Sequence, residues 1–553
     1  MNNKKIANQF KLLGQLSELL GENPFKARSY QNAYRVIRSE AIDWMNAEKE
    51  QLLEVKGIGK NIADKIIELQ RDGKMTAMES RLEQVPEGVI QLLGIKGLGP
   101  KKIRALWKEL DIISPEELHY ACIENRLTLL KGFGEKTQKN VQDKVEFFLK
   151  SKNKRRLADV YDLVQSILEH ANEQQFQLEV VGAFRRKCNI LDKVEFVFAG
   201  ELQVLRKILQ DNDFQFEVTE KGLQVKWEEN FPMVFYRVEE NNFNRAILLK
   251  TLPEHSWEVN KVPYESEQDL FDHLGYAQAL PELLDWSEDE LSTVLKPNEV
   301  LIDVQDIKGL VHCHTTYSDG RNSIEEMARA AQEAGLEYMV LTDHSQSAFY
   351  AGGLKEEDIL RQHEEIEAWN EKSGGFYIFK SIESDIKPDG SLDYGDEILG
   401  KFDLIIASVH AQLNMSEEKA TERLIRAIEN PFTTILGHPT GRLLLGRKGY
   451  PVDMQRVIES CAENGVAIEL NSNPWRLDID WKWIPLCKSM KVPILICPDA
   501  HDTTGIKDIR FGIMSARKGG LTAANCWNSL SRNDFQRLIT KDRDSRLNFI
   551  NNL

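Results

Sequence analysis

The sequence predicts a multidomain α/β protein with an all-α N-terminal part, an α+β middle and a C-terminal (β/α)7 barrel. Three observations lead to this prediction. The chain has 553 residues, several times the length of one domain. A Gly-x-Gly motif recurs in the N-terminal part. After Asp303, short apolar segments that end in polar residues alternate with amphipathic segments, the pattern of strands and helices in an α/β barrel.

The composition, with 42% hydrophobic and 29% charged residues, is that of a globular protein. Because there is no apolar run of about twenty residues and the opening "MNNKKIANQF" lacks an apolar core, we expect a cytoplasmic protein without membrane contact. The 7 cysteines form no C-x-x-C pair, so we expect reduced thiols rather than disulfides.

Charge is distributed unevenly along the chain. The net charge is −16, yet residues 1–157 hold 29 Lys and Arg against 21 Asp and Glu, a balance of +8 that leaves −24 for the remainder. The basic end is therefore suited to contact a polyanion, and the acidic end to hold cations.

The basic end carries the Gly-x-Gly motif three times, in "LLEVKGIGKNIADKI" from Leu52, "LLGIKGLGPKKIRAL" from Leu92 and "LLKGFGEKTQKNV" from Leu129. This pattern is typical of helix–hairpin–helix motifs, because two glycines let the turn approach a phosphate and the next helix presents free N–H groups. A plain helical hairpin is the alternative for a single copy, but three copies favour sequence-independent binding of the DNA backbone. The predicted DNA-binding residues are Lys56, Gly57, Gly59, Lys60, Lys96, Gly97, Gly99, Lys101, Lys102, Lys131, Gly132, Gly134 and Lys136.

Upstream, "NPFKARSYQNAYRVI" (residues 23–37) and the first hairpin resemble the small N-terminal domain of family X DNA polymerases. That resemblance implies that Lys65 forms a Schiff base at abasic sites, with Tyr34 and Lys60 in the phosphate pocket. In the cluster of Lys56, Lys60 and Lys65, the two neighbouring cations would favour loss of the proton from the Lys65 amine. The alternative is an exposed helix lysine that binds phosphate.

The middle of the chain, with a helix "LADVYDLVQSILEHA" and strands "FQLEVVGAFRR" and "VEFVFAG", resembles the nucleotidyltransferase palm of the same family. In that family a glycine turn and arginines hold the triphosphate, and three aspartates hold metal. Gly182, Arg185 and Arg186 match the first feature, but Lys193 and Glu195 stand at the Asp-x-Asp positions, and the alignment places Phe235 at the third acid. Two-metal catalysis requires carboxylates, so we expect a degenerate palm that serves as a scaffold or clamp and has lost polymerase activity.

Seven predicted strands follow, "GLVHCH", "YMVLTDH", "FYIFKSIES", "LIIASVH", "TTILGHP", "VAIELNS" and "VPILICPDAH". Barrels of this type place their sites at the carboxyl ends of the strands. There the sequence offers His312, His314, Asp319, His344, Glu383, His410, His438, Asp499 and His501 as metal ligands. We expect strand alternation to direct His312 and His314 to one face, and likewise Asp499 and His501. This ligand set suits two or three Zn²⁺, Mn²⁺ or Fe²⁺ ions bridged by Glu383, while its suitability for Mg²⁺ stays open.

The motifs "HCHTTYSDG", "LTDHS", "SIESDI", "ASVH", "GHPTGR" and "PDAH" resemble the PHP (polymerase and histidinol phosphatase) domain over residues 308–553. The resemblance implies hydrolysis of phosphate esters by a metal-bound water. It makes Arg442 a candidate phosphate holder, with a surface salt bridge as the alternative. Asp343 and Asp385 are candidates for residues that orient the ligands.

The predicted domains are a lyase-like domain with the first hairpin (1–80), a second hairpin domain (81–150), the degenerate palm (151–245), a thumb-like segment (246–302) and the PHP domain (303–553). This order resembles the bacterial PolX family. It implies a DNA repair enzyme that acts on gapped, nicked or abasic DNA as a 3′–5′ exonuclease, abasic-site endonuclease or 3′-phosphatase. The alternatives are a small-molecule phosphatase of the histidinol-phosphatase type and a DNA-binding adaptor with structural metals. The sequence predicts no particular protein partner.

Overall fold

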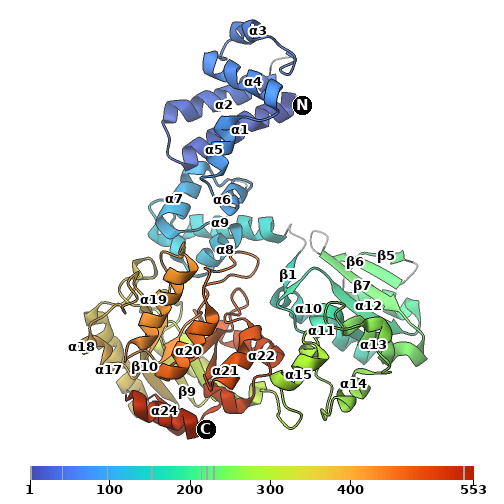
Figure 1. The fold of residues 1–553 in the computed structure, drawn as a ribbon, viewed down its shortest axis with the longest axis vertical. Coiled ribbons are helices and arrows are strands. Elements are labelled where there is room, and N and C mark those ends of the chain that lie inside the picture. The colour runs from blue at the N-terminus through green and yellow to red at the C-terminus, as the bar shows by residue number, and fades with distance from the viewer. Residues whose placement is uncertain are drawn as a thin grey trace. The chain divides into compact units, whose positions relative to one another are not determined.

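The computed structural model describes residues 3–39, 42–95, 97–150, 154–212, 214–219, 222–227, 231–539 and 542–552. It divides into two compact units, Met1–Leu149 and Lys150–Leu553, coloured from blue to red along the chain in Figure 1. No helix within these ranges is long and apolar enough to cross a membrane. All 7 cysteines are free, and only Cys188 is not fully buried.

The described part of the first unit is helical throughout, as predicted. Its helices are α1 (Asn3–Leu19), α2 (Pro24–Ser39), α3 (Lys49–Glu54), α4 (Lys60–Asp72), α5 (Thr76–Leu82), α6 (Glu87–Leu92), α7 (Pro100–Leu110), α8 (Pro115–Ile123) and α9 (Glu135–Lys150). The apolar faces of these amphipathic helices form the core, with Phe10, Tyr30, Ile66 and Leu106 each at most 1% exposed.

The three Gly-x-Gly turns share one geometry. Their first glycines, Gly57, Gly97 and Gly132, have φ of 100°, 87° and 91°, in the region that side chains disfavour. The middle residues Ile58, Leu98 and Phe133 are 4%, 5% and 2% exposed, so each anchors its turn in the core. The second glycines directly precede α4, α7 and α9, which leaves backbone N–H groups in the first turn of each helix open to solvent or ligand, although Pro100 at the start of α7 has no N–H.

The second unit begins with a five-stranded sheet in the order β2-β4-β7-β6-β5. The strands are β2 (Gln177–Val181), β4 (Val194–Ala199), β5 (Phe216–Thr219), β6 (Gly222–Trp227) and β7 (Phe231–Arg237), with α10 (Leu157–Glu173) and α12 (Leu202–Asp211) among its helices. The strand expected over residues 176–186 ends at Val181, because Gly182 adopts φ of 67° and begins the short helix α11 (Gly182–Arg185). A separate apolar core follows around α13 (Phe243–Thr251), α14 (Glu267–His273) and α15 (Glu288–Val294).

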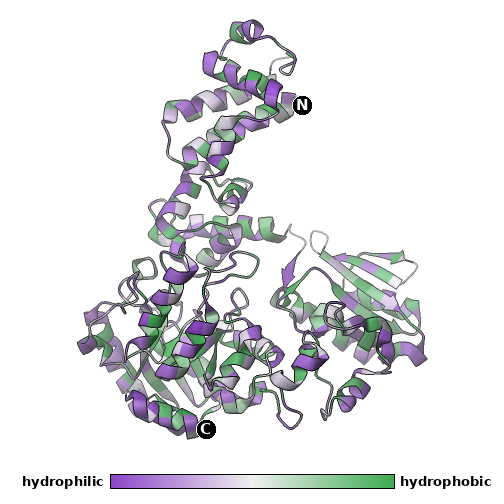
Figure 2. Cartoon of the chain, viewed as in Figure 1, coloured by the Kyte–Doolittle hydropathy of each residue, from purple (hydrophilic) through white to green (hydrophobic). Residues whose placement is uncertain are grey.

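The C-terminal part is a nearly closed barrel of seven parallel strands in the order β8 to β14, which confirms the predicted architecture. The strands are β8 (Gly309–Cys313), β9 (Tyr338–Leu341), β10 (Tyr377–Asp385), β11 (Leu404–Ser408), β12 (Ile435–Leu436), β13 (Ala467–Asn471) and β14 (Ile494–Cys497). The intervening helices are α16 (Ile324–Glu333), α17 (Glu356–Lys372), α19 (Glu417–Glu429), α20 (Met454–Asn464) and α21 (Ile484–Ser489), and α22 (Ile509–Lys518) follows β14. Figure 2 shows green, hydrophobic residues on the strands, as expected for a parallel sheet that is buried on both faces.

Ion pairs join the parts of the second unit. The ammonium of Lys518, at the end of α22, is 1% exposed and contacts Asp285, while Arg517 donates to Glu282 at 2.7 Å. Trp286 Nε1 donates to the carbonyl of Lys518 at 2.7 Å. The segment between the five-stranded sheet and the barrel is therefore fixed against α22.

Candidate metal centre and nucleic-acid interface

The nine predicted metal ligands all lie at the carboxyl ends of the barrel strands. His312 is within β8 and Glu383 within β10, whereas the other seven lie in the loops that follow β8, β9, β11, β12 and β14. His312, Glu383 and His438 are at most 1% exposed. Because parallel strands end on one side of a barrel, residues nearly 190 positions apart in the sequence converge here.

Strand alternation is not what directs the paired ligands, so that expectation was wrong. A β-bulge between Val311 and Cys313 shifts the register at His312, which has φ of 67°. Asp499 lies beyond the end of β14 and has φ of 53°. The pairs still meet, since the rings of His312 and His314 are 5.3 Å apart and Nδ1 of His501 lies 3.8 Å from Oδ1 of Asp499. A bulge and a turn that re-aim side chains achieve what regular pleating was expected to do.

Three groups of side chains could each hold an ion within the described residues. They are His314, Asp319, His344 and His501, then His312, His314 and Asp499, and finally His344, Glu383 and His410. In each group the candidate ligand atoms lie within 4.8 Å of one another. His314 and His344 each belong to two groups, so adjacent ions would share ligands.

Glu383 lies at the centre of the cluster. Its Oε1 is 3.3, 3.1 and 3.0 Å from Nε2 of His312, His410 and His438, and its Oε2 is 2.9 Å from Nδ1 of His344 and 3.8 Å from Nε2 of His314. A carboxylate with imidazoles on both oxygens has the geometry of a bridging ligand. His438, which belongs to none of the three groups, joins the cluster through this contact.

The buried polar atoms fit metal coordination. Nε2 of His312, Nδ1 of His314 and Oε2 of Glu383 are buried and make no hydrogen bond. Burying a polar atom without a hydrogen bond costs folding free energy. A divalent cation can bind to the lone pairs of such nitrogen and oxygen atoms. Burial would raise the pKa of Glu383, but His410, His312 and His344 hold it well below its usual value, so the carboxylate is ionised. Burial also lowers the pKa of His438 to about 3, which leaves a neutral imidazole.

A second set of carboxylates holds the imidazole rings. Nδ1 of His312 lies 3.0 Å from Oε2 of Glu469, and Nδ1 of His410 contacts Asp385. Asn471 donates to Oδ2 of Asp499 at 3.0 Å. Such contacts fix the ring that binds a metal and raise its basicity. Asp385 was predicted from the sequence, whereas Glu469 and Asn471 were not, although acidic and amide side chains within the apolar strand "VAIELNS" were a visible signal.

Asp343 supports the site differently from what was expected. Its carboxylate accepts hydrogen bonds from Thr315 N at 2.8 Å, Ser318 Oγ at 2.5 Å and Gln362 Nε2 at 2.7 Å. It therefore orders the loop that leads to Asp319 rather than orienting a histidine directly.

Arg442 is engaged in structural contacts. Its Nε donates to the carbonyl of Arg476 at 3.0 Å, and its two other nitrogens donate to Asp480 and to the carbonyl of Leu477. These bonds favour the salt-bridge alternative over the phosphate holder. The arginine near the cluster is Arg476, whose buried Nε lies 3.5 Å from Oδ2 of Asp499.

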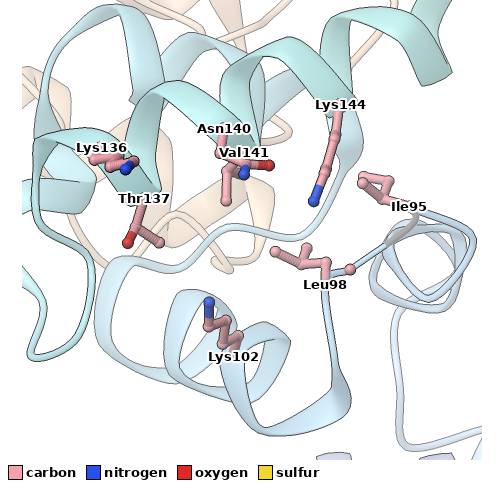
Figure 3. A pocket seen from close by; sticks show the side chains of 9 residues that line it. Ile95, Leu98, Lys102, Lys136, Thr137, Asn140, Val141 and Lys144 are labelled. Carbon is pink, nitrogen blue, oxygen red and sulfur yellow. The ribbon is translucent and has the colours of Figure 1, made fainter.

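In the first unit, the predicted hairpin lysines Lys56, Lys60, Lys101, Lys102, Lys131 and Lys136 are exposed, while Lys96 lies outside the described residues. A cavity of about 280 Å³ lies between the second hairpin and α9. Lys102, Lys136 and Lys144 line it together with Thr137 and Asn140, and Figure 3 shows the amine of Lys144 above Leu98. Lys144 was missed, although it follows Lys136 by two helical turns and so shares its face.

Lys65 is partly buried on α4. Its Nζ donates to Oδ1 of Asn61 at 2.7 Å and lies 6.0 Å from the centre of the Tyr30 ring. Burial lowers the pKa of Lys65, Glu68 opposes this, and Lys26 adds to it. The lowered pKa favours the free amine that a nucleophile needs. The hydroxyl of Tyr34 accepts a hydrogen bond from Arg38 at 2.7 Å.

The palm arginines are bound to carboxylates of the chain. Arg185 donates to Glu267 at 2.6 Å, and Arg186 donates to Asp285 at 2.8 Å. These ion pairs occupy the groups that the resemblance assigned to a triphosphate. Gly182 lies against Glu195, since a Cβ added there would be 2.7 Å from Oε2 of that residue.

Of the three positions aligned with the family's acids, Lys193, Glu195 and Phe235, one carries a carboxylate. Glu195 is bound by Lys193 Nζ and by the hydroxyl of Tyr236, both at 2.8 Å from Oε1. Glu195 pairs with Val234, and Phe235 instead pairs with Phe196 in the core, where their rings stack at 4.5 Å. The alignment of Phe235 with the third acid was therefore wrong, because paired residues of parallel strands share a face.

Family models match three segments of the chain. A helix-hairpin-helix domain matches residues 1–75, a SAM-like helix-hairpin-helix tandem matches residues 89–145, and a PHP domain matches residues 311–473. The chain also resembles two proteins named as probable phosphatases. The one from Caldanaerobacter subterraneus subsp. tengcongensis is 33% identical over 34% of this chain and 74% of its own length. The one from a Thermoanaerobacter species is 30% identical over 38% of this chain and 86% of its own length.

A further relative matches along nearly the whole chain. The DNA polymerase/3'-5' exonuclease PolX of Bacillus subtilis (strain 168) is 31% identical over 98% of this chain and 100% of its own length. The match joins the hairpins, the five-stranded sheet and the barrel in one alignment. The chain therefore belongs to the PolX family, with helix–hairpin–helix domains and a PHP domain.

Proposed function

We propose that this chain is a metal-dependent phosphoesterase that cleaves DNA at ends or abasic sites, as a 3′–5′ exonuclease, abasic-site endonuclease or 3′-phosphatase, and that it has lost polymerase activity. The arrangement around Glu383 carries the proposal, because five imidazoles contact its carboxylate. This geometry supports two or three Zn²⁺, Mn²⁺ or Fe²⁺ ions, held by the nine predicted ligands. Ions bound there would activate water and hold phosphate oxygens.

The chain's own residues prepare the site for this chemistry. Glu469 and Asp385 hold His312 and His410 by their Nδ1 atoms, so their Nε2 atoms face Glu383. Asn471 and Arg476 contact the oxygen of Asp499 that faces away from His314. His312, His410 and Asp499 are thus each held by a neighbouring side chain, which reduces the reorganisation that binding a phosphate ester requires.

The hairpins would supply the DNA. The three turns expose helix N-termini beside lysines, and the cavity lined by Lys102, Lys136 and Lys144 is suited to a backbone phosphate. Binding through phosphates is independent of sequence, as a repair enzyme requires. We also propose the five-domain division 1–80, 81–150, 151–245, 246–302 and 303–553, which the separate apolar cores of the second unit support.

The degenerate palm would act as a structural element. Lys193 neutralises Glu195, and the core position of Phe235 adds no carboxylate, so the site lacks the ligands for two Mg²⁺ ions. A primer-extension assay with Mg²⁺ or Mn²⁺ tests this directly, and robust incorporation of nucleotides would refute it.

The decisive experiment compares wild-type protein with His410→Ala and Asp499→Ala in Mn²⁺, on gapped, abasic and 3′-phosphate DNA. We expect product from at least one substrate with wild type and a loss of at least about a hundredfold in both variants, because each removes an ion ligand. DNA cleavage that survives both substitutions would favour the adaptor alternative, with the activity due to a contaminant.

The probable phosphatases support a second candidate function. They match about a third of the chain, and their printed names describe phosphatases. A small-molecule phosphatase would hydrolyse histidinol phosphate and leave labelled DNA intact, so both substrates belong in the same assay. The basic hairpins favour DNA.

A further inference from the structure

A large aromatic side chain is exposed beside the metal cluster. Phe349 is 74% exposed and begins the short helix η6 (Phe349–Ala351), five residues after the candidate ligand His344. Single exposed apolar residues are common, so exposure alone carries no conclusion. The position of Phe349 beside the metal cluster and the rigidity of its loop do support a conclusion.

The loop that carries Phe349 is held closed by its own backbone. Leu354 N donates to the carbonyl of His344 at 2.9 Å, and Gly353 N donates to that of Ala348 at 3.1 Å. Ala348 and Leu354 are fully buried, so the apolar residues of the loop are divided between an inner face and Phe349 outside. The backbone thus fixes the exposure of Phe349.

The same loop is anchored to two neighbouring segments of the barrel. Ser347 N donates to Oδ2 of Asp393 at 2.6 Å, and Gln346 N donates to the hydroxyl of Tyr394 at 3.0 Å. Gly352 lies against Ser318, because a Cβ there would be 3.7 Å from the Ser318 carbonyl oxygen. Ser318 directly precedes the candidate ligand Asp319, so the loop borders the metal cluster on this side as well.

Tyr350 connects Phe349 to the cluster. Its ring centre lies 6.3 Å from that of His344 and 5.9 Å from that of Phe349. Tyr350 is partly buried, which leaves the Phe349 ring as the outermost member of a row of three rings. A flat apolar surface of this kind accepts the face of a nucleobase, and stacking of this sort is independent of base identity.

We propose that Phe349, supported by Tyr350, stacks on the base of the nucleotide whose phosphate occupies the metal cluster. This inference rests on the proposed function and deepens it, since it makes the substrate a DNA strand with a terminal base rather than a small phosphate ester. Stacking on one base corresponds to a factor of about 5 to 150 in affinity or kcat/KM.

The test crosses two enzymes with two substrates. Full-length wild type and Phe349→Ala are assayed in Mn²⁺ on single-stranded DNA that ends in a 3′ thymine and on the same strand that ends in a tetrahydrofuran abasic analogue. We expect Phe349→Ala to lose about 5- to 150-fold in kcat/KM on the thymine strand and to lose less than twofold on the abasic strand. Phe349→Trp should retain the wild-type preference for a terminal base. Leu360→Ala, on α17 and 49% exposed, is the matched control and should change neither rate.

A binding measurement gives a readout that needs no turnover. A strand with 3′-terminal 2-aminopurine, protected by a terminal phosphorothioate, should lose fluorescence on binding to wild type and keep it on binding to Phe349→Ala. In the kinetic test, an equal loss of kcat/KM by Phe349→Ala on the thymine and abasic strands, or no loss on either, would overturn the inference. The proposal of DNA hydrolysis would still stand. If wild type hydrolyses neither strand with Mn²⁺, Zn²⁺ or Fe²⁺ but cleaves gapped, abasic or 3′-phosphate DNA, the inference fails and the proposed function stands. If wild type cleaves none of these substrates, both fail.

Discussion

Replacing Glu469 with glutamine should weaken metal binding although it leaves all nine candidate ligands unchanged in sequence. Glu469 is fully buried, and its Oε2 lies 3.0 Å from Nδ1 of His312, whose other nitrogen faces Glu383. Glutamine has the same shape but no charge, so the hydrogen bond that polarises the imidazole becomes neutral. Hydrogen bonds to charged groups contribute about 1.5 to 3 kcal/mol, whereas neutral ones contribute about 1 kcal/mol.

The consequence for metal affinity can be worked out from this bond. Losing a carboxylate behind a metal-binding histidine typically costs 10- to 100-fold in affinity, or about 1.4 to 2.7 kcal/mol. We expect the Mn²⁺ concentration that gives half-maximal DNA cleavage to rise by a factor in this range for Glu469→Gln. Calorimetric titration of Mn²⁺ into metal-free protein should show the same shift. Glu463→Gln, an exposed position on α20, is the control and should leave both unchanged. Unaltered Mn²⁺ dependence in Glu469→Gln would refute the reasoning.

Three further predictions concern other parts of the chain. Replacing Lys102, Lys136 and Lys144 with alanine should weaken DNA binding for all sequences and reduce the magnitude of the slope of log K against log salt by about 1 per lysine. Fluorescence anisotropy measures this slope, and an unchanged slope would contradict the cavity as a phosphate site. If Lys65 is a lyase nucleophile, borohydride should trap wild type on abasic DNA but not Lys65→Ala, and equal trapping would exclude that role. Asp285→Asn should lower the free energy of unfolding by about 3 kcal/mol at pH 7, because the Lys518 ammonium is 1% exposed and loses its counter-charge. Burial would raise the pKa of Asp285, but Lys518 and Arg186 lower it below its ordinary value. The stabilisation by the Asp285 carboxylate is therefore present above a pH of about 4 and declines as the pH falls below that value. Urea unfolding at pH 7 and below about pH 4 measures this decline.

The sequence was informative wherever local pattern determines structure. Seven short apolar runs with polar ends predicted the barrel strands, because parallel strands are buried on both faces and the ligands sit at their ends. The Gly-x-Gly turns were predictable because positive φ at Gly57 and Gly97 requires glycine.

The remaining features depend on tertiary structure and left no local signal. The bulge at His312 is set by pairing with the neighbouring strand. Phe235 lies on the core face because of the register of β7 against β4, which no residue of β7 reveals on its own. The carboxylates that bind Arg185 and Arg186 come from Glu267 and Asp285, 82 and 99 residues further along the chain.

Those two ion pairs bear on what nucleotide transfer in the five-stranded sheet would require. Installing acids by Lys193→Asp and Val234→Asp would supply ligands on the face of Glu195, yet an incoming triphosphate would still meet arginines that are committed elsewhere. Freeing Arg186 means removing Asp285, the same carboxylate that neutralises Lys518 of the barrel. A substitution that frees Arg186 would therefore leave the buried Lys518 ammonium without its counter-charge, so the availability of this arginine is coupled to the stability of the contact between α22 and the preceding segment.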